Sequence, residues 1–367
     1  AASEVPEPVM KAFVESEGVV RVTGHGTTKS SIVLESGIAA DLRVVSPAQY
    51  PYALMHFTGS KEHNVVMRQR AKDRGLKLNE YGLFDGEDLV TCKTEKDIYK
   101  KLDSPYIPPE MREDMGEFQI KKTPKLIEKD ALKGLIHCHS TYSDGKATLK
   151  KMAEAAKERG YQYMVICDHS QSAAYAGGLQ PARVKKQHTE IDKLNKSFKN
   201  FKIVKGIESD IRTDGSLDYD EALLKRFEII VASIHSGLNM DEKTATKRVV
   251  TAIENPYTTI LGHPTGRLLL QREGFPLDWD RVFAACAANR VAIELNANCR
   301  RLDLDWRLIR RAKETGCMFS IGPDAHTVEG IDDVRYGIGI ARKGWLEAGD
   351  LLNTLTRVQL LKWKQGK

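Results

Sequence analysis

The sequence has few of the features that mark secreted or membrane proteins. Its six cysteines form no Cys-x-x-Cys pair, and most lie in apolar patterns, as small hydrophobic side chains do. The longest apolar stretches fall well short of the roughly 20 residues that a membrane helix needs. The first residues lack the basic segment and apolar core of a secretion signal. These absences argue against a disulfide scaffold and a membrane-spanning protein, and they favour a cytoplasmic one.

The sequence also lacks low-complexity tracts and a strong charge of either sign. With 41% hydrophobic and 29% charged residues, it has the composition of a soluble globular protein. A length of 367 residues predicts two or more domains at about 150 residues each. The net charge of +6 leans towards an anionic partner, although so mild an excess is also typical of a solvated surface.

The first 47 residues predict a helix followed by short strands. The helix is expected over 8–16, and β-branched runs predict strands over 19–22, 31–34 and 41–45. On the last of these, Asp41 and Arg43 share a face. An aspartate there suits a catalytic carboxylate or an ordinary surface salt bridge, and the sequence leaves both open.

A turn over 57–60 then leads into a helix rich in cations. The basic side chains are Arg68, Arg70, Lys72 and Arg74. A turn with exposed backbone beside a cationic helix is suited to binding phosphate.

Four motifs in this part carry a family resemblance. They are Asp-Leu-Arg-Val (41–44), Phe-Thr-Gly-Ser-x-x-x-Asn (57–64), Leu-Asn-Glu-Tyr-Gly-Leu-Phe (78–84) and Tyr-Ile-Pro-Pro-Glu-Met-Arg-Glu (106–113). Together they resemble the last part of the palm and the thumb of a bacterial family X DNA polymerase. The resemblance implies that Asp41, with Arg43 beside it, is the third catalytic carboxylate of the palm. It also implies that Thr58, Gly59 and Asn64 hold the incoming nucleotide.

The sequence departs from that family in one respect. The resemblance implies an Asp-x-Asp pair just before Ala1, preceded by fingers and a lyase-type domain, and this sequence does not contain them. Paired carboxylates hold the two magnesium ions of nucleotidyl transfer. We therefore expect no DNA polymerase activity from this chain alone.

Between 103 and 133, prolines and charges replace the periodic apolar residues, which is typical of a linker. An apolar run then leads into His137 and His139, followed by Asp144 in a polar loop that opens a helix at Thr148. Two histidines two apart on a strand point to the same face. With a carboxylate they suit zinc, manganese or iron, whereas the alternative is a pair of half-buried strand histidines.

The remaining sequence repeats an apolar run, a polar break and an amphipathic helix. The predicted strands lie at 134–137, 163–167, 202–207, 229–234, 259–261, 291–295 and 318–321. Their near-continuous apolar character predicts a buried parallel sheet, and its closure into a barrel would bring the strand ends to one face. Six of the ten histidines fall at these ends, namely His137, His139, His169, His235, His263 and His326, beside the acidic or amide residues Asp168, Glu208, Glu294, Asn296 and Asp324.

The motifs at these ends resemble the polymerase and histidinol phosphatase (PHP) family. They are His-x-His-x4-Asp-Gly, Asp-His-Ser, Gly-Ile-Glu, Ser-Ile-His-Ser, Gly-His-Pro and Pro-Asp-Ala-His, in this order. The resemblance implies three divalent cations, manganese or zinc, with iron as a further option. It assigns His137, His139, Glu208 and Asp324, the expected catalytic set, to the first cation. It assigns Glu208, His235 and His263 to the second, and Asp144, His169 and His326 to the third.

Three divalent cations would carry a charge of about +6, and Asp144, Glu208 and Asp324 would contribute about −3. The net charge of about +3 would attract hydroxide and phosphate. Four basic residues at or near the strand ends are candidate phosphate contacts or ordinary surface cations: Arg267, Arg300, Arg301 and Lys146. Asp168 is expected either to orient a ligand imidazole or to cap a helix. His188, in a basic helical stretch, is expected to be solvated.

We therefore predict an α/β protein in which a distorted (βα)7 TIM-like barrel follows a smaller α+β palm and thumb remnant. The expected boundaries are a partial palm at 1–47, the thumb at 48–120, a linker at 121–133 and a PHP phosphoesterase domain at 134–367. The expected activity is metal-dependent hydrolysis of DNA. A 3′–5′ exonuclease with 3′-end processing or abasic-site cleavage in DNA repair fits best.

Two alternatives remain open from the sequence. The barrel could act as a small-molecule phosphatase of the histidinol-phosphate type, or it could be a non-catalytic platform stapled by metals. The expected partners are accordingly DNA or small phosphate esters, and no membrane.

Overall fold

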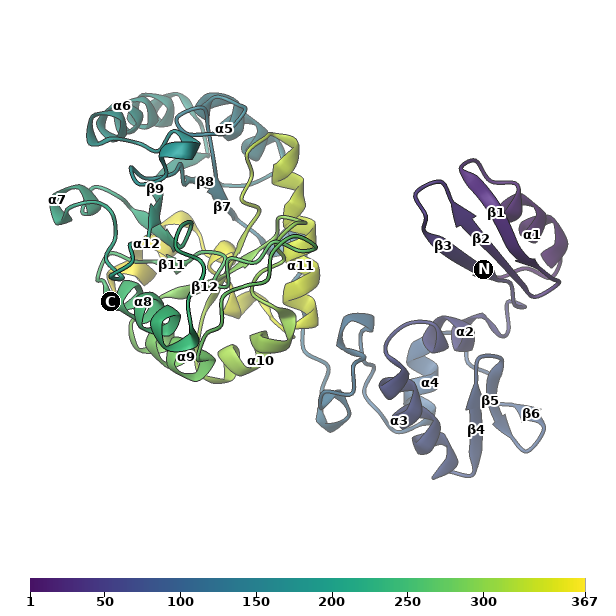
Figure 1. The fold of residues 1–367 in the computed structure, drawn as a ribbon. Helices are drawn as coiled ribbons and strands as arrows, with labels where there is room; N and C mark the ends of the chain where they lie inside the picture. Colours follow the sequence, from purple (N-terminus) through teal and green to yellow (C-terminus); the bar gives the residue numbers. More distant parts are fainter. Residues whose placement is uncertain (367) are drawn as a thin grey trace. The chain divides into compact units, whose positions relative to one another are not determined.

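Figure 1 shows the computed structural model of the chain, in which residues 1–366 are described. The chain divides into two units, Ala1–Thr123 and a larger one that begins at Pro124. None of the described helices has the length and apolar character needed to cross a bilayer. The bounds of the four predicted segments remain predictions.

The N-terminal unit begins with a helix and a three-stranded antiparallel sheet of order β1-β2-β3. These elements are α1 (Pro6–Val14), β1 (Val19–His25), β2 (Lys29–Leu34) and β3 (Ala39–Arg43). Pro6 occupies the first turn of α1, where its missing N–H costs nothing. Met10 of α1 and Ile32 of β2 are buried, so the helix covers the sheet with its apolar side.

The second part of this unit combines three helices with another antiparallel sheet. The elements are α2 (Tyr50–His56), α3 (Lys61–Lys72), β4 (Leu76–Asn79), β5 (Gly82–Asp85), β6 (Asp88–Leu89) and α4 (Glu95–Lys101). Helix α3 begins where the Ser60 hydroxyl accepts the backbone N–H of His63 at 3.0 Å. Helix α4 begins at a reciprocal capping box between Thr94 and Asp97.

The larger unit is built on seven parallel strands in the order β13-β12-β11-β10-β9-β8-β7. The strands are β7 (Gly134–Cys138), β8 (Tyr163–Ile166), β9 (Lys202–Asp210), β10 (Ile229–Ser233), β11 (Ile260–Leu261), β12 (Ala292–Asn296) and β13 (Phe319–Gly322). This arrangement confirms the predicted parallel (βα)7 architecture.

Helices lie around the outside of the strands (Figure 1). They are α5 (Leu149–Glu158), α6 (Pro181–Ser197), α7 (Glu221–Leu224), α8 (Glu242–Glu254), α9 (Trp279–Ala288), α10 (Trp306–Glu314) and α11 (Val334–Lys343). A last helix, α12 (Arg357–Gln365), packs Leu360 among strand residues such as Ile136 and Val165. Short 3-10 turns cover Pro109–Met111, Glu117–Gln119, Lys129–Ala131, Ala174–Ala176, Glu329–Asp333, Ala348–Asp350 and Leu352–Thr354.

Alternating side chains give the barrel two apolar cores. Ile136 and Val165 belong to an inner cluster, whereas Leu135 and Met164 belong to the larger cluster that includes residues of the surrounding helices. Leu352 and Leu360 also belong to the inner cluster. The segment after β13 therefore supplies part of the barrel's interior.

The barrel is nearly closed where β7 meets β13. Toward the carboxyl ends, Cys138 and Ala325 form a parallel bridge. Toward the other end, the Asn353 amide donates to the carbonyls of Gly134 and Ile321 at 3.1 and 2.9 Å, and its oxygen accepts the Ile321 N–H at 2.8 Å. One buried side chain thus replaces the missing backbone ladder between the two edge strands.

Candidate metal centre

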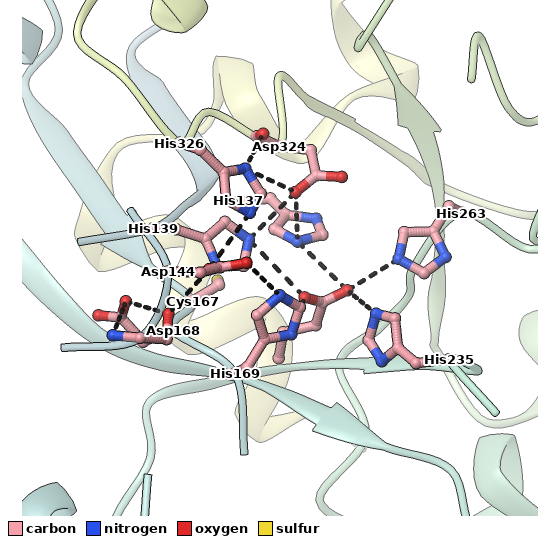
Figure 2. Close-up of polar contacts among 12 residues, drawn as sticks. His137, His139, Asp144, Cys167, Asp168, His169, His235, His263, Asp324 and His326 are labelled. Carbon is pink, nitrogen blue, oxygen red and sulfur yellow. Dashed lines mark hydrogen bonds and ion pairs between the residues drawn. The ribbon is translucent and has the colours of Figure 1, made fainter. Parts of the chain in front are cut away.

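Six histidines and three carboxylates converge at the carboxyl ends of the barrel strands, as parallel strands in a barrel require. Figure 2 shows His137, His139, His169, His235, His263 and His326 facing a common centre with Asp144 and Asp324. Glu208, within β9, lies among them. The residues that the sequence predicted as ligands therefore meet at one place, although they are up to about 190 positions apart.

Three of these residues have unusual backbone conformations. His137, His263 and Asp324 have φ values of +70°, +22° and +52°, although none is a glycine. At His137 the pairing of β7 with β8 is shifted by a bulge. Such conformations persist only where surrounding structure enforces them, and here they aim side chains at the cluster.

The expectation of two histidines on a regular strand was thus incomplete. The His137 and His139 rings do lie close, with centroids 5.3 Å apart. The two rings come together through a bulge and not through the plain alternation of a regular strand, because His137 itself has a positive φ and interrupts the pleat of β7.

Glu208 is the central acceptor of the cluster. Its Oε1 atom lies 2.8 Å from Nε2 of His263, 3.2 Å from Nε2 of His235 and 3.5 Å from Nε2 of His137. Its Oε2 atom lies 3.0 Å from Nδ1 of His169 and 3.7 Å from Nε2 of His139. The two oxygens of one carboxylate therefore face two different groups of imidazoles.

The other two carboxylates face four of the six imidazoles, three of which also face Glu208. Asp324 Oδ1 lies 3.1 Å from His139 Nε2 and 3.6 Å from His137 Nε2. Asp144 lies 3.3 Å from His326 Nε2 and 3.6 Å from His169 Nε2. Three groups of these side chains have ligand atoms within 4.8 Å of one another: His139, Asp144, His169 and His326; His137, His139 and Asp324; and His169, Glu208 and His235.

The buried nitrogens and oxygens of this cluster fit metal ions. His137 Nε2, both ring nitrogens of His139, His169 Nδ1 and Glu208 Oε2 are inaccessible to solvent and make no hydrogen bond within residues 1–366. A buried polar atom without a partner costs about 1–3 kcal/mol, so a group of them at one point is rare without a ligand. Imidazole nitrogen and carboxylate oxygen are the donors that zinc, manganese and iron accept.

The raised pKa values of two histidines in the cluster also indicate a site for cations. Burial lowers the pKa of His137, but Glu294, Glu208 and Asp324 outweigh it and hold that pKa well above the usual value. Burial also opposes the charge of His235, yet Glu208 and Asp210 raise its pKa to about 10. The carboxylates thus attract positive charge to this point, and divalent cations would take the place of those protons.

Carboxylates behind the cluster orient its imidazoles. Glu294 hydrogen-bonds Nδ1 of His137 and accepts the backbone N–H of His263 at 2.7 Å. Asp210 lies 2.9 Å from Nδ1 of His235. We did not single out Asp210 from the sequence, although its position two residues after Glu208 on the same strand is a signal that could have identified it.

Asp168 has neither of its two predicted roles. It is fully buried and accepts Ser140 N–H and both hydroxyls of Ser140 and Ser143, together with the Gln187 amide. It therefore braces the loop between His139 and Asp144 instead of orienting an imidazole or capping a helix. The expectation for His188 was also wrong, because this side chain is buried and packs against Phe227.

The four basic candidates lie in different environments. Arg301 pairs with Asp324 at 3.5 Å, so it reaches the cluster. Arg267 instead donates to the Arg301 carbonyl at 2.9 Å and pairs with Asp305 at 3.0 Å, which ties it to the neighbouring loop after β12. The side chains of Arg300 and Lys146 are exposed. Phosphate binding by these residues remains a prediction.

The residues predicted for the polymerase remnant lie in the N-terminal unit. Asp41 is exposed and pairs with Lys29 at 2.8 Å, which is the surface salt bridge named above as an alternative. Arg43 donates to the Tyr81 hydroxyl at 3.1 Å. The Asn64 amide donates to the His56 carbonyl at 2.8 Å.

The turn before α3 is closely fitted to its surroundings. Gly59 has φ +108°, and a side chain there would collide with Arg112. The Thr58 carbonyl lies 3.5 Å from the Arg112 guanidinium. The nucleotide-binding roles of Thr58, Gly59 and Asn64 and the catalytic role of Asp41 remain predictions.

The four predicted cations, which lie in α3 or just after it, separate into two pairs. Arg70 donates to the Phe118 carbonyl, and Arg74 pairs with Asp103 at 3.2 Å. Arg68 and Lys72 are exposed and, four residues apart, share the opposite side of the helix. The predicted basic face therefore reduces to Arg68 and Lys72.

Comparisons with known proteins agree with these two units. Residues 136–298 match the family model of the PHP domain, and residues 53–113 match that of the DNA polymerase beta thumb. A probable phosphatase of Caldanaerobacter subterraneus subsp. tengcongensis is 30% identical over 208 residues, which cover 52% of this chain and 74% of that protein. The chain therefore belongs to the PHP family.

A further relative includes both units. The Bacillus subtilis protein named DNA polymerase/3′-5′ exonuclease PolX is 43% identical over 357 residues, which cover 96% of this chain and 63% of that protein. The resemblance to bacterial family X DNA polymerases is thereby confirmed, and the chain spans about 63% of the length of this relative. The solved histidinol phosphate phosphatase of Lactococcus lactis is 16% identical with a TM-score of 0.44, over 57% of this chain and 93% of that one.

Proposed function

We propose that this chain is a divalent-metal-dependent phosphoesterase that hydrolyses DNA from a 3′ end, with 3′-end processing or abasic-site cleavage as related activities in DNA repair. The observation that carries the proposal is the group of buried imidazole nitrogens beside Glu208 and Asp324 that make no hydrogen bond in the described part of the chain. A basic thumb on the same chain supports DNA as the substrate, and so does the name of the Bacillus subtilis relative.

In this proposal the cluster holds three cations. In this assignment Glu208 is the ligand shared between two of them, because a carboxylate has two oxygens and can bridge two ions, whereas a neutral imidazole offers one lone pair. Asp324 with His137 and His139 completes one cation's ligands, and Asp144 with His169 and His326 supplies the third's. Manganese or zinc suits this donor set best, with iron as a further option.

The chemistry that bound divalent cations supply is Lewis acidity, which stabilises charge on a phosphate and makes water a stronger nucleophile near neutral pH. The chain's own residues position the reaction. Glu294 and Asp210 fix the ring orientations of His137 and His235. Arg301, beside Asp324, would balance the charge of a bound phosphate.

A small-molecule phosphatase is the second candidate, because one relative of this chain is named as a probable phosphatase. The test uses labelled single-stranded and 3′-recessed DNA with manganese, beside a small phosphate monoester. Release of 3′ nucleotides well above the rate of monoester hydrolysis is the expected result. Hydrolysis of the monoester alone would favour the second candidate, and inactivity on both would favour the metal-stapled platform.

A further inference from the structure

An exposed aromatic ring stands beside the metal cluster. Tyr175 is 73% exposed, and its ring centroid lies 6.2 Å from that of His169 and 6.4 Å from that of His235. Its neighbours Ala173 and Ala176 are buried. The short turn Ala174–Ala176 thus buries Ala176 and presents its one large ring, Tyr175, at the rim of the site.

The loop that carries this ring is firmly anchored. Leu179 donates its N–H to the carbonyl of His169 at 2.8 Å, so the loop returns directly to a proposed ligand residue. Arg183 holds the Gly177 carbonyl at 2.8 Å. A side chain at Gly178 would collide with the Ser170 carbonyl, which shows how closely the loop packs on itself.

A buried carboxylate fixes the start of the same loop. Asp218 accepts the Ser170 hydroxyl at 2.7 Å and the Ser172 N–H at 2.8 Å, and it is shielded from solvent. The exposure of Tyr175 is therefore a property of a well-packed loop. Large aromatic rings are usually buried at least in part, so a ring that a rigid loop keeps exposed to solvent is suited to binding a ligand.

The chemistry of the ring identifies the kind of ligand. Tyrosine carries no charge at neutral pH and offers a flat apolar face, which does not bind phosphate but does stack on a nucleobase. In a nucleotide, one sugar separates the base from the phosphate. A strand with its terminal phosphodiester at the cluster would therefore bring a base to the rim where Tyr175 stands.

We propose that Tyr175 forms a stacking subsite for the nucleobase next to the phosphodiester that is hydrolysed. The inference rests on the proposed nuclease function and adds a binding site for the base to it. Stacking on an aromatic ring accepts any base, so this subsite would tolerate sequence while favouring ends that retain a base.

Two matched oligonucleotides test the subsite. One ends in an ordinary 3′ nucleotide, and the other ends in an abasic residue that keeps the same phosphodiester. Tyr175→Ala should raise KM for the ordinary end by roughly 5- to 150-fold, the range that the loss of one stacked base implies. The KM ratio between the two substrates should collapse towards one, whereas Tyr175→Phe should preserve it.

A control variant and a binding measurement complete the design. Tyr336 is another exposed tyrosine of the same unit, and it contacts Arg335 on helix α11, so Tyr336→Ala should leave the KM ratio unchanged. A strand ending in 2-aminopurine, joined by a phosphorothioate that slows cleavage, reports stacking through fluorescence quenching. The quenching should occur with the unmodified protein and be lost with Tyr175→Ala.

The outcomes separate the subsite from the function on which it rests. If the protein cleaves both oligonucleotides and Tyr175→Ala changes their KM values equally, the subsite is overturned and the nuclease function stands. If the unmodified protein neither cleaves the strands nor quenches the probe, both proposals are overturned.

Discussion

His63 in the N-terminal unit and His139 in the barrel are both fully buried, yet their ring nitrogens are in opposite situations. His63 places Nδ1 at 2.8 Å from a Glu117 oxygen and Nε2 at 2.8 Å from the Tyr99 hydroxyl. Neither nitrogen of His139 makes a hydrogen bond in the described part of the chain, although Asp324 lies 3.1 Å away.

The difference separates a structural histidine from a proposed ligand. Burial alone is shared by both residues and therefore carries no information about function. An imidazole whose two nitrogens already make hydrogen bonds gains nothing by binding a cation. An imidazole whose nitrogens make no hydrogen bond and lie beside carboxylates is stabilised by binding one. The two sites should accordingly respond in different ways to substitution.

The largest effect should follow Glu208→Gln. The substitution keeps the shape but removes the charge shared by two proposed cations, so both should be lost or loosened together. We expect a fall in hydrolysis of roughly 10²–10³-fold. Metal content by mass spectrometry, measured beside the rate, checks this.

His326→Ala is the matched comparison for Glu208. It should disturb chiefly the third cation and leave more of the paired site intact. If Glu208→Gln kept its metals while His326→Ala lost two, the assignment of the shared ligand would be refuted.

His63→Ala should lower stability without changing metal content. Glu117 would lose its imidazole partner and a cavity would form, which together should cost about 2–4 kcal/mol of unfolding free energy. All four tryptophans, Trp279, Trp306, Trp345 and Trp363, belong to the barrel unit. Denaturant unfolding followed by circular dichroism should therefore shift, while the tryptophan fluorescence transition should not. A loss of bound metal would contradict the structural role of His63.

Asp210→Asn should weaken metal binding less than Glu208→Gln does. Removal of the carboxylate that orients His235 is expected to reduce metal affinity about 10- to 100-fold. Titration of the metal-free protein with manganese provides the measurement. Asp214→Asn is the control, because Asp214 bonds Ser216 in an exposed turn and should leave the titration unchanged.

The smallest effect concerns two pairs of cations in helix α3 or just after it, Arg68 with Lys72 and Arg70 with Arg74. Loss of Arg68 and Lys72 together should make the salt dependence of DNA cleavage shallower, by about 0.7 to 0.9 in the log–log slope for each phosphate contact removed. Loss of Arg70 and Arg74 removes the same charge but breaks contacts with Phe118 and Asp103. The second variant should lose stability and retain the slope, and equal slopes in both variants would remove the basis for DNA docking on this helix.

Much of the barrel could be predicted because each strand is an apolar run with a polar residue at its carboxyl end. The parallel sheet then follows from the βα rhythm, and the convergence of the strand ends follows from the barrel. The expected ligands of the candidate centre were named from this pattern and from the family motifs. Their distribution among three cations remains a proposal.

The remaining features depend on contacts that no local pattern records. The bulge at His137 arises from pairing with β8, and the burial of His188 arises from packing against Phe227. Arg267 follows a strand end, and its contact with the Arg301 carbonyl of a neighbouring loop is likewise absent from the local pattern, whereas its phosphate-binding role remains a prediction. Such outcomes are set by tertiary neighbours, which sequence spacing does not specify.

The seam held by Asn353 has a consequence for how the unit folds. Its bond to Gly134 joins residues 219 positions apart, and Leu352 and Leu360 enter the inner core from the same distant segment. Closing so long a loop is slow, because the chain loses entropy before the contact is gained. Early strands of a nascent chain can pair with one another, but the ring of ligands closes only when β13 and the segment after it have been made. A truncation before Asn353 should therefore yield a protein that is open at the seam and aggregates through its unpaired edge strands.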